Sequence, residues 1–120
     1  MTKILIVEDN EMNMRLFADL LKSKGYHVVQ CLDGKKALDI AKTEKPDLIL
    51  MDIQMPEISG LEVTALIRAT PEIAQTKIIA VTAFAMKGDE QKIIDGGCDG
   101  YIAKPISIPE FFATVESFLK

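Results

Sequence analysis

Short runs of apolar residues recur along the chain, and segments with a helical spacing of apolar residues separate them. The runs cover residues 4–7, 27–30, 48–51, 78–81 and 100–103. Each run is too short and too apolar on both faces to be half of an antiparallel hairpin, which is typical of strands buried in a parallel sheet. The pattern predicts five strands that alternate with helices.

Two of the intervening segments have clear helical patterns. Residues 11–24 follow Asn10, a good N-cap, and stop at Gly25. The predicted apolar stripe of this helix consists of Met12, Leu16, Phe17, Leu20 and Leu21. The stripe of the last helix runs from Ile108 to Leu119. Weaker patterns predict helices near 34–43, 60–69 and 86–95.

Strands joined by single helices run parallel, because each crossover returns the chain to the same edge of the sheet. The predicted fold is therefore an α/β doubly wound sheet with helices on both faces. Ligands of such sheets bind outside the carboxyl ends of the strands. The 120 residues fit one domain, spanning 1–120.

Composition excludes several classes of function. Fourteen Lys and Arg against 18 Asp and Glu give a net charge of -4, and the chain has no basic run that could follow a phosphate backbone, which disfavours direct binding to DNA. The apolar runs are far shorter than the ~18 residues of a membrane span, and no signal peptide pattern occurs, so we expect a cytoplasmic protein. The two cysteines, Cys31 and Cys98, have no metal-binding or redox spacing and are expected to be free thiols.

Polar residues follow four of the five predicted strands. Glu8 and Asp9 end the first, and the third, fourth and fifth are followed by Asp52, Thr82 and Lys104. All five side chains should converge on one rim. Three carboxylates held close together repel one another, so the cluster calls for a cation. Oxygen ligands from two or three carboxylates suit Mg²⁺ better than Ca²⁺, which takes more protein ligands.

This set of residues can carry phosphoryl chemistry. Asp52 could attack phosphorus as a nucleophile while a metal held by Asp9 and Asp52 neutralises phosphoryl oxygens. Lys104 would add a fixed positive charge and Thr82 a hydrogen bond.

Each residue also has a plainer explanation when taken alone. Glu8 and Asp9 could favour the start of the helix that follows them, because acidic residues interact well with a positive helix end. Asp52 could be a loop residue, Thr82 a β-branched strand residue and Lys104 a solvated tip. Chance is a poor explanation for all of them together at the ends of four parallel strands.

Four motifs resemble the receiver domains of bacterial two-component response regulators, in the same order and over almost the whole chain. They are ILIVEDN at 4–10, PDLILMDIQMPEISG at 46–60, IIAVTAFA at 78–85 and YIAKPI at 101–106. The runs MDIQMPEISGLEVT, VTAFAMKGDE and GGC further resemble a single-domain cell-division regulator of that family, which implies a role in cell-division control.

The resemblance implies a flavodoxin-like sheet of order 2-1-3-4-5 and a role for each motif residue. Asp52 is implied as phosphoacceptor, and Thr82 and Lys104 as the pair that binds the phosphoryl group. The implied Mg²⁺ ligands are Asp9, Asp52 and the backbone carbonyl of Gln54, with Glu8 in contact directly or through water, and Mn²⁺ is an expected substitute. Tyr101 matches the aromatic residue that turns inward as the hydroxyl residue moves, and the Lys104-Pro105 bond is expected to be cis.

The same resemblance implies partners. A histidine kinase, a phosphatase or a phosphotransfer protein would exchange the phosphoryl group, and a downstream protein would bind through residues 86–119. We expect no output domain, and a switch that catalyses its own phosphorylation and slow dephosphorylation rather than a turnover enzyme.

Two other functions share parts of this pattern. A phosphohydrolase with an aspartyl-phosphate intermediate commonly needs a second aspartate two positions after the nucleophile, and this chain has Gln54 there. A flavin or nucleotide binder should have a glycine-rich loop after the first strand, where this chain has Glu8, Asp9 and Asn10.

Overall fold

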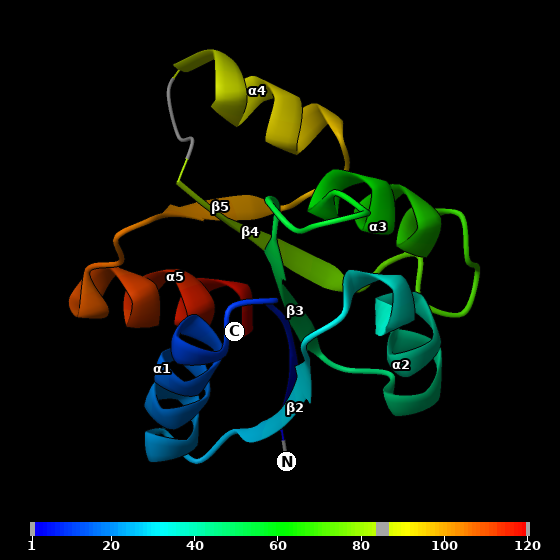
Figure 1. The fold of residues 1–120 in the computed structure, drawn as a ribbon. Coiled ribbons are helices and arrows are strands. Elements are labelled where there is room, and N and C mark those ends of the chain that lie inside the picture. The colour runs from blue at the N-terminus through cyan, green and yellow to red at the C-terminus, as the bar shows by residue number, and fades with distance from the viewer. Residues whose placement is uncertain (1, 84–86, 120) are drawn as a thin grey trace.

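The computed structural model describes residues 2–83 and 87–119 (Figure 1). Within them the elements are β1 (Lys3–Val7), α1 (Glu11–Ser23), β2 (His27–Cys31), the 3₁₀ helix η1 (Gly34–Lys36), α2 (Ala37–Glu44), β3 (Leu48–Asp52), α3 (Gly60–Arg68), β4 (Lys77–Thr82), α4 (Lys87–Asp95), β5 (Gly100–Ala103) and α5 (Ile108–Leu119). The predicted alternation of strands and helices is confirmed. Part of the helix predicted near 34–43 is a 3₁₀ turn, and residue 86, predicted to begin the fourth helix, lies outside the described residues.

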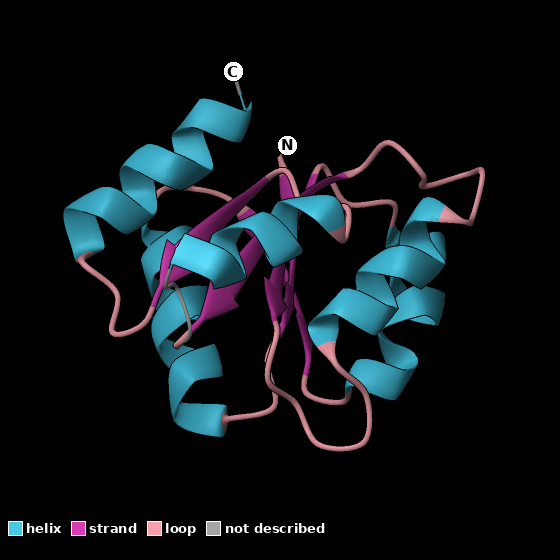
Figure 2. Cartoon of the chain, turned by 90° about the horizontal axis from the view of Figure 1, so that it is seen from above, coloured by secondary structure: helices cyan, strands magenta, loops and turns pink. Residues whose placement is uncertain are grey.

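The strands form one parallel sheet in the order β2-β1-β3-β4-β5. Helices cover both of its faces, as Figures 1 and 2 show. One core lies between the sheet and the pair α1 and α5, and a second lies on the face covered by α2, α3 and α4. The doubly wound fold and its strand order are therefore confirmed. No described helix has the length and apolar character needed to span a bilayer.

The central strand β3 is buried at all five positions, and β1 at four of five. This is what parallel strands covered on both faces require, and it explains the apolar runs in the sequence. At the carboxyl ends of β3 and β4, two polar residues are nevertheless buried, Asp52 and Thr82. Their burial places polar chemistry at one edge of the sheet.

Helix α1 begins and ends as predicted but turns a different stripe toward the sheet. The side chain of Asn10 accepts a hydrogen bond from the Asn13 amide at 2.9 Å, and Gly25 has φ of 86° just after the helix. The buried residues are Met14, Phe17, Ala18 and Leu21. The prediction was wrong for Met12 and Leu16, which are 83% and 41% exposed. Two overlapping apolar stripes run along this helix, and the one that contains the small Ala18 packs on the sheet.

Candidate functional site

The carboxyl ends of four strands bring the predicted site residues to one edge of the sheet. Asp52 and Thr82 are the last residues of β3 and β4, and Lys104 directly follows β5. Glu8 and Asp9 directly follow β1. One carboxylate oxygen from each of Glu8, Asp9 and Asp52 lies within 4.8 Å of the others. The structure thus brings together the acidic residues that the sequence placed on one rim.

Lys104 links the two buried carboxylates of this cluster. Its Nζ lies 3.1 Å from Glu8 Oε1 and 3.4 Å from Asp52 Oδ1. The side chains of Glu8 and Asp52 are only 1% and 2% exposed, while that of Lys104 is 21% exposed. A buried carboxylate is strongly destabilising unless it is paired with a cation. Lys104 supplies the ammonium group that pairs with both buried carboxylates.

Backbone hydrogen bonds fix where the Lys104 and Glu8 side chains begin. The Lys104 amide donates to the Thr82 carbonyl at 2.7 Å, which extends the β4–β5 pairing past the end of β5. The peptide bond between Lys104 and Pro105 is cis, as expected from the resemblance. The Glu8 amide donates to the Cys31 carbonyl at 3.0 Å and continues the β1–β2 pairing in the same way.

The position of Glu8 does not support the plainer explanation that it favours the start of the next helix. Asn10 caps α1, and Glu11 is the acidic residue of the first turn. Glu8 Oε2 accepts a hydrogen bond from the Asn10 amide at 3.2 Å, while Oε1 accepts one from Lys104. Hydrogen bonds therefore fix both carboxylate oxygens of Glu8, one to Lys104 and one to the backbone before α1.

The environment of Asp52 disfavours its charged form. Burial, followed by the neighbouring Glu8 carboxylate, raises the pKa of Asp52 to about 7. Lys104 acts in the opposite direction, as does the Gln54 amide, which donates to Asp52 Oδ1 at 3.2 Å. A divalent cation among these carboxylates would favour the ionised form of Asp52.

The donor chemistry of the cluster fits Mg²⁺. Its three carboxylates supply hard oxygen ligands, and three protein ligands leave positions for water and phosphate oxygens. Gln54 lies next to this set through its amide contact with Asp52. Its carbonyl as a ligand stays a prediction.

Sequence reasoning did not single out Gly60, which the structure places against the site. A Cβ on Gly60 would lie 2.2 Å from the backbone carbonyl oxygen of Asp52. The helix that starts there is fixed by a capping box of Ser59 and Glu62. The sequence contains a signal for the start of this helix, because Ser-Gly-Leu-Glu has the spacing of a capping box.

Tyr101 lies outside the acidic cluster. It is half-buried in β5, and its hydroxyl donates a hydrogen bond to Glu90 Oε1 of α4 at 2.5 Å. Its hydroxyl therefore points toward α4.

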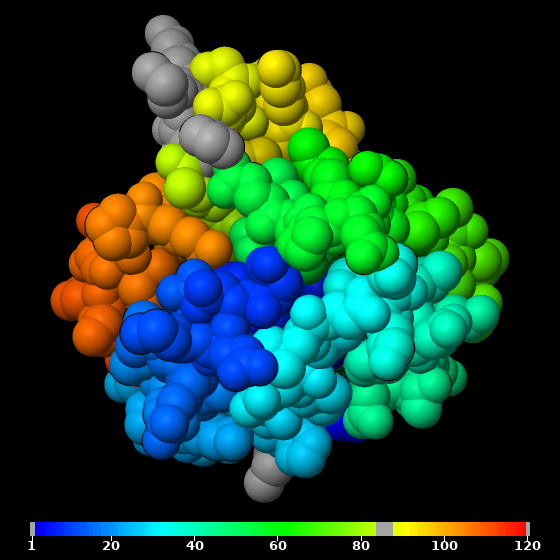
Figure 3. Space-filling view, viewed as in Figure 1, coloured from blue at the N-terminus to red at the C-terminus, as the bar shows by residue number. Residues whose placement is uncertain are grey.

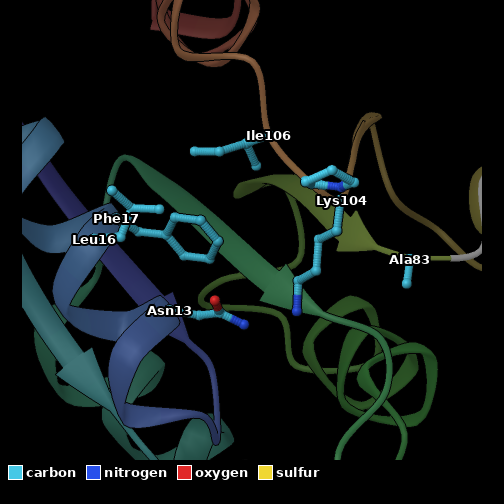
Figure 4. Close-up of a pocket in the computed structure, with 7 residues that line it drawn as sticks. Asn13, Leu16, Phe17, Ala83, Lys104 and Ile106 are labelled. Atoms are coloured by element: carbon cyan, nitrogen blue, oxygen red, sulfur yellow. The ribbon is translucent and has the colours of Figure 1, made fainter.

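An apolar groove of about 410 Å³ runs beside the cluster (Figure 4). Asn13, Leu16 and Phe17 of α1 line one side, and the other side is lined by Ala83, Lys104, Pro105 and Ile106. Since Lys104 belongs to both, the groove adjoins the acidic cluster. The exposed Met12 of α1 and Ile108 of α5 add further apolar surface on these two helices.

A family model described as the response regulator receiver domain matches residues 4–116. The chain is 56% identical over 120 residues to the polar-differentiation response regulator DivK of Brucella ovis, covering 99% of this chain and 98% of the relative.

Solved structures agree with this match. The chain is 35% identical, with a TM-score of 0.89, to the receiver domain of a sensor histidine kinase from Pseudomonas aeruginosa, which has a magnesium ion coordinated in its active-site cleft; 98% of this chain and 96% of that chain are covered. The chemotaxis protein CheY4 of Vibrio cholerae aligns with a TM-score of 0.92 at 26% identity and 98% coverage of both chains.

Proposed function

Because the chain belongs to the response regulator receiver domain family, we propose that Asp52 is the phosphoacceptor of a phosphorelay switch. The observation that supports this choice best is the pairing of a buried Asp52 with Lys104 at 3.4 Å, at the edge of the sheet where Glu8 and Asp9 also converge. The protein accepts a phosphoryl group from a histidine kinase or a phosphotransfer protein and passes the signal on by binding other proteins.

The chemistry is a phosphoryl transfer between side chains. A carboxylate oxygen of Asp52 forms a bond to phosphorus while the bond from phosphorus to the donor imidazole nitrogen breaks, and the electron pair stays on that nitrogen. Lys104 stabilises the charge on the phosphoryl oxygens, and the Thr82 hydroxyl donates a hydrogen bond to one of them. In a separate, slow dephosphorylation, water attacks phosphorus, the bond from phosphorus to the Asp52 oxygen breaks, and inorganic phosphate leaves while the Asp52 carboxylate is regenerated.

The carboxylates of Asp9 and Asp52 would hold Mg²⁺, with the Gln54 carbonyl as a further ligand and Glu8 in contact directly or through water. A bound metal would supply positive charge beside the phosphoryl oxygens and the Asp52 carboxylate, which otherwise repel each other. Mn²⁺, with the same oxygen preference, is expected to substitute. The magnesium ion in the related Pseudomonas aeruginosa domain supports this assignment.

The apolar groove beside Lys104 is the docking surface that we propose for the phosphodonor. A donor histidine must reach Asp52, so the donor protein has to contact the surface around the cluster. The groove adjoins Lys104, and Leu16 on its other side is 41% exposed. The downstream partner binds elsewhere, through the surface formed by α4, β5 and α5.

Close relatives point to the process in which the switch acts. A 56% identical relative over nearly full length is a polar-differentiation response regulator, which supports a role in cell-cycle and cell-division control. A phosphohydrolase is not favoured, because Gln54 stands where such enzymes commonly have their second aspartate.

Intact-mass spectrometry after incubation with acetyl phosphate tests the proposal. We expect one phosphoryl adduct that depends on Mg²⁺ and is lost in Asp52→Asn. Asp39→Asn, which alters an exposed aspartate on α2, serves as the matched control and should keep the adduct. An adduct that persists in Asp52→Asn would place the acceptor on another residue.

A further inference from the structure

The hydrogen bond from the Tyr101 hydroxyl to Glu90 Oε1 joins β5 to α4. A second side-chain hydrogen bond of this helix, from Gln91 to Asp95, lies within α4 and does not connect it to another element. The contact between Tyr101 and Glu90 spans eleven residues of sequence and connects two elements of the α4-β5-α5 surface.

The rest of α4 is weakly anchored. Of its described side chains only Ile93 is buried, and Ile94 is 44% exposed. Figures 1 and 3 show α4 at one end of the molecule, next to α3. With so little apolar burial, one hydrogen bond to a carboxylate is a substantial part of what positions this helix.

Tyr101 shares a sheet face with Thr82. The β4–β5 register pairs Ala80 with Tyr101, and Thr82 with Ala103. Paired residues point to the same face and residues two apart along a strand do so as well, so Ala80, Thr82 and Tyr101 lie on one face. The residue directly opposite Tyr101 on β4 is the small Ala80.

We propose that the Glu90 carboxylate holds Tyr101 toward α4 and thereby sets how readily phosphorylation at Asp52 switches the protein. The inference rests on the proposed function, because it requires Tyr101 to turn toward Thr82 in the phosphorylated form. On that turn the hydroxyl leaves Glu90, whose carboxylate then accepts from water, and α4 loses its side-chain hydrogen bond to β5. The same bond raises the pKa of the Tyr101 hydroxyl, since Glu90 favours the protonated phenol.

Removing the acceptor should shift the equilibrium by about three- to tenfold toward the inward position, which matches the net contribution of a typical hydrogen bond. Glu90→Ala removes the acceptor altogether. Glu90→Gln keeps a neutral acceptor and should have a smaller effect in the same direction. Asp95→Asn removes one negative charge from the same helix without touching Tyr101 and is the matched control.

The experiment uses fluorine NMR of a chain labelled with 3-fluorotyrosine. Tyr26 and Tyr101 are its two tyrosines, so Tyr26→Phe leaves Tyr101 as the single label. Beryllofluoride with Mg²⁺, which substitutes for a phosphoryl group on aspartate, is titrated while the Tyr101 resonance is followed. We expect half-conversion at an about three- to tenfold lower beryllofluoride concentration in Glu90→Ala, an intermediate value in Glu90→Gln and no change in Asp95→Asn.

An unchanged midpoint in Glu90→Ala and Glu90→Gln would overturn the proposal, and so would an equal shift in Asp95→Asn. A Tyr101 resonance that ignores beryllofluoride, in a protein that still acquires the Asp52 phosphoryl adduct, would refute the switch role of Tyr101 and leave the phosphoacceptor assignment standing. Loss of that adduct would instead refute the proposed function, and the role of Glu90 with it.

Discussion

Lys104 Nζ lies 3.1 Å from Glu8 Oε1 although the two residues are 96 positions apart in the sequence. The pair joins the first strand of the chain to the last, across the carboxyl edge of the sheet. Asp52, between them in the strand order, contacts the same ammonium. One cation therefore compensates two carboxylates that are almost fully buried.

Lys104→Met should be strongly destabilising at pH 8 and much less so at pH 5. At pH 8 it leaves the Glu8 and Asp52 carboxylates buried without a cation, a change that typically costs about 3 kcal/mol or more. At pH 5 Asp52, with a pKa raised to about 7, takes up a proton and the repulsion falls. Urea unfolding in EDTA at the two pH values measures the difference.

Lys35→Met is the matched control for that experiment. Lys35 pairs with Glu57 through side chains that are more than half exposed, so its loss should change the stability very little at either pH. Equal losses in the two variants would show that the burial of Glu8 and Asp52 does not matter.

Asp52→Asn should stabilise the protein in EDTA above pH 7. Burial raises the pKa of Asp52 from 3.8 to about 7, so the folded state holds this proton more tightly than the unfolded chain does. The contribution of Asp52 to stability thus falls as the pH rises from about 4 to 7 and is constant above that window. We expect Asp52→Asn to gain about 1–3 kcal/mol at pH 8 and close to nothing at pH 4. Asp39→Asn, on the surface of α2, should show no such pH dependence.

Mg²⁺ should raise the stability of the native sequence through the same carboxylates. At a concentration a hundredfold above its Kd, a ligand that binds only the folded state adds about 2.7 kcal/mol. Asp9→Asn should remove most of this gain, because Asp9 belongs to the carboxylate cluster. Thermal unfolding across a Mg²⁺ series tests this, with Asp19→Asn on the exposed side of α1 as control. A full Mg²⁺ response in Asp9→Asn would remove Asp9 from the ligand set.

Gly60→Ala should disrupt the turn that carries Asp52. The new Cβ would lie 2.2 Å from the backbone carbonyl oxygen of Asp52. A backbone atom cannot move aside as the end of a flexible side chain can, so the turn itself would have to shift. The expected loss exceeds the ~1–3 kcal/mol typical of overpacking. Gly88→Ala is the opposite case, since nothing lies within 4 Å of its Cβ position in α4 and alanine favours a helix by roughly 1 kcal/mol. Denaturant unfolding of both variants should therefore give shifts of opposite sign.

The strands were predictable because both faces of a parallel sheet are buried. Each predicted run lies inside an observed strand, and the differences are single residues such as Lys3 and Cys31 at the ends. Alternation alone indicated parallel strands, whereas the order of the strands came from the family resemblance. The convergence of Glu8, Asp52 and Lys104 on one edge follows directly from parallel topology.

Side-chain partners across the fold could not be predicted in this way. The sequence pattern places Tyr101 in the last strand but does not show that Glu90 of α4 accepts a hydrogen bond from its hydroxyl. Apolar periodicity likewise could not separate the two stripes of α1, because both contain Phe17 and Leu21 and only packing against the sheet decides between them. Because the other stripe packs against the sheet, Met12 and Leu16 are left exposed.

Leu16→Asp should slow phosphotransfer from a phosphorylated histidine phosphotransfer protein while leaving phosphorylation by acetyl phosphate unchanged. The small donor needs only the chemistry around Asp52, whereas a protein donor must also bury the apolar groove that Leu16 lines. A charge in the centre of such an interface typically costs about 2 kcal/mol or more, roughly a thirtyfold loss in kcat/KM. Leu66→Asp adds the same charge at a leucine of similar exposure, 45% against 41%, on α3 at the other face of the sheet. We expect it to transfer at the native rate, and equal losses in both variants would place the donor surface away from the groove.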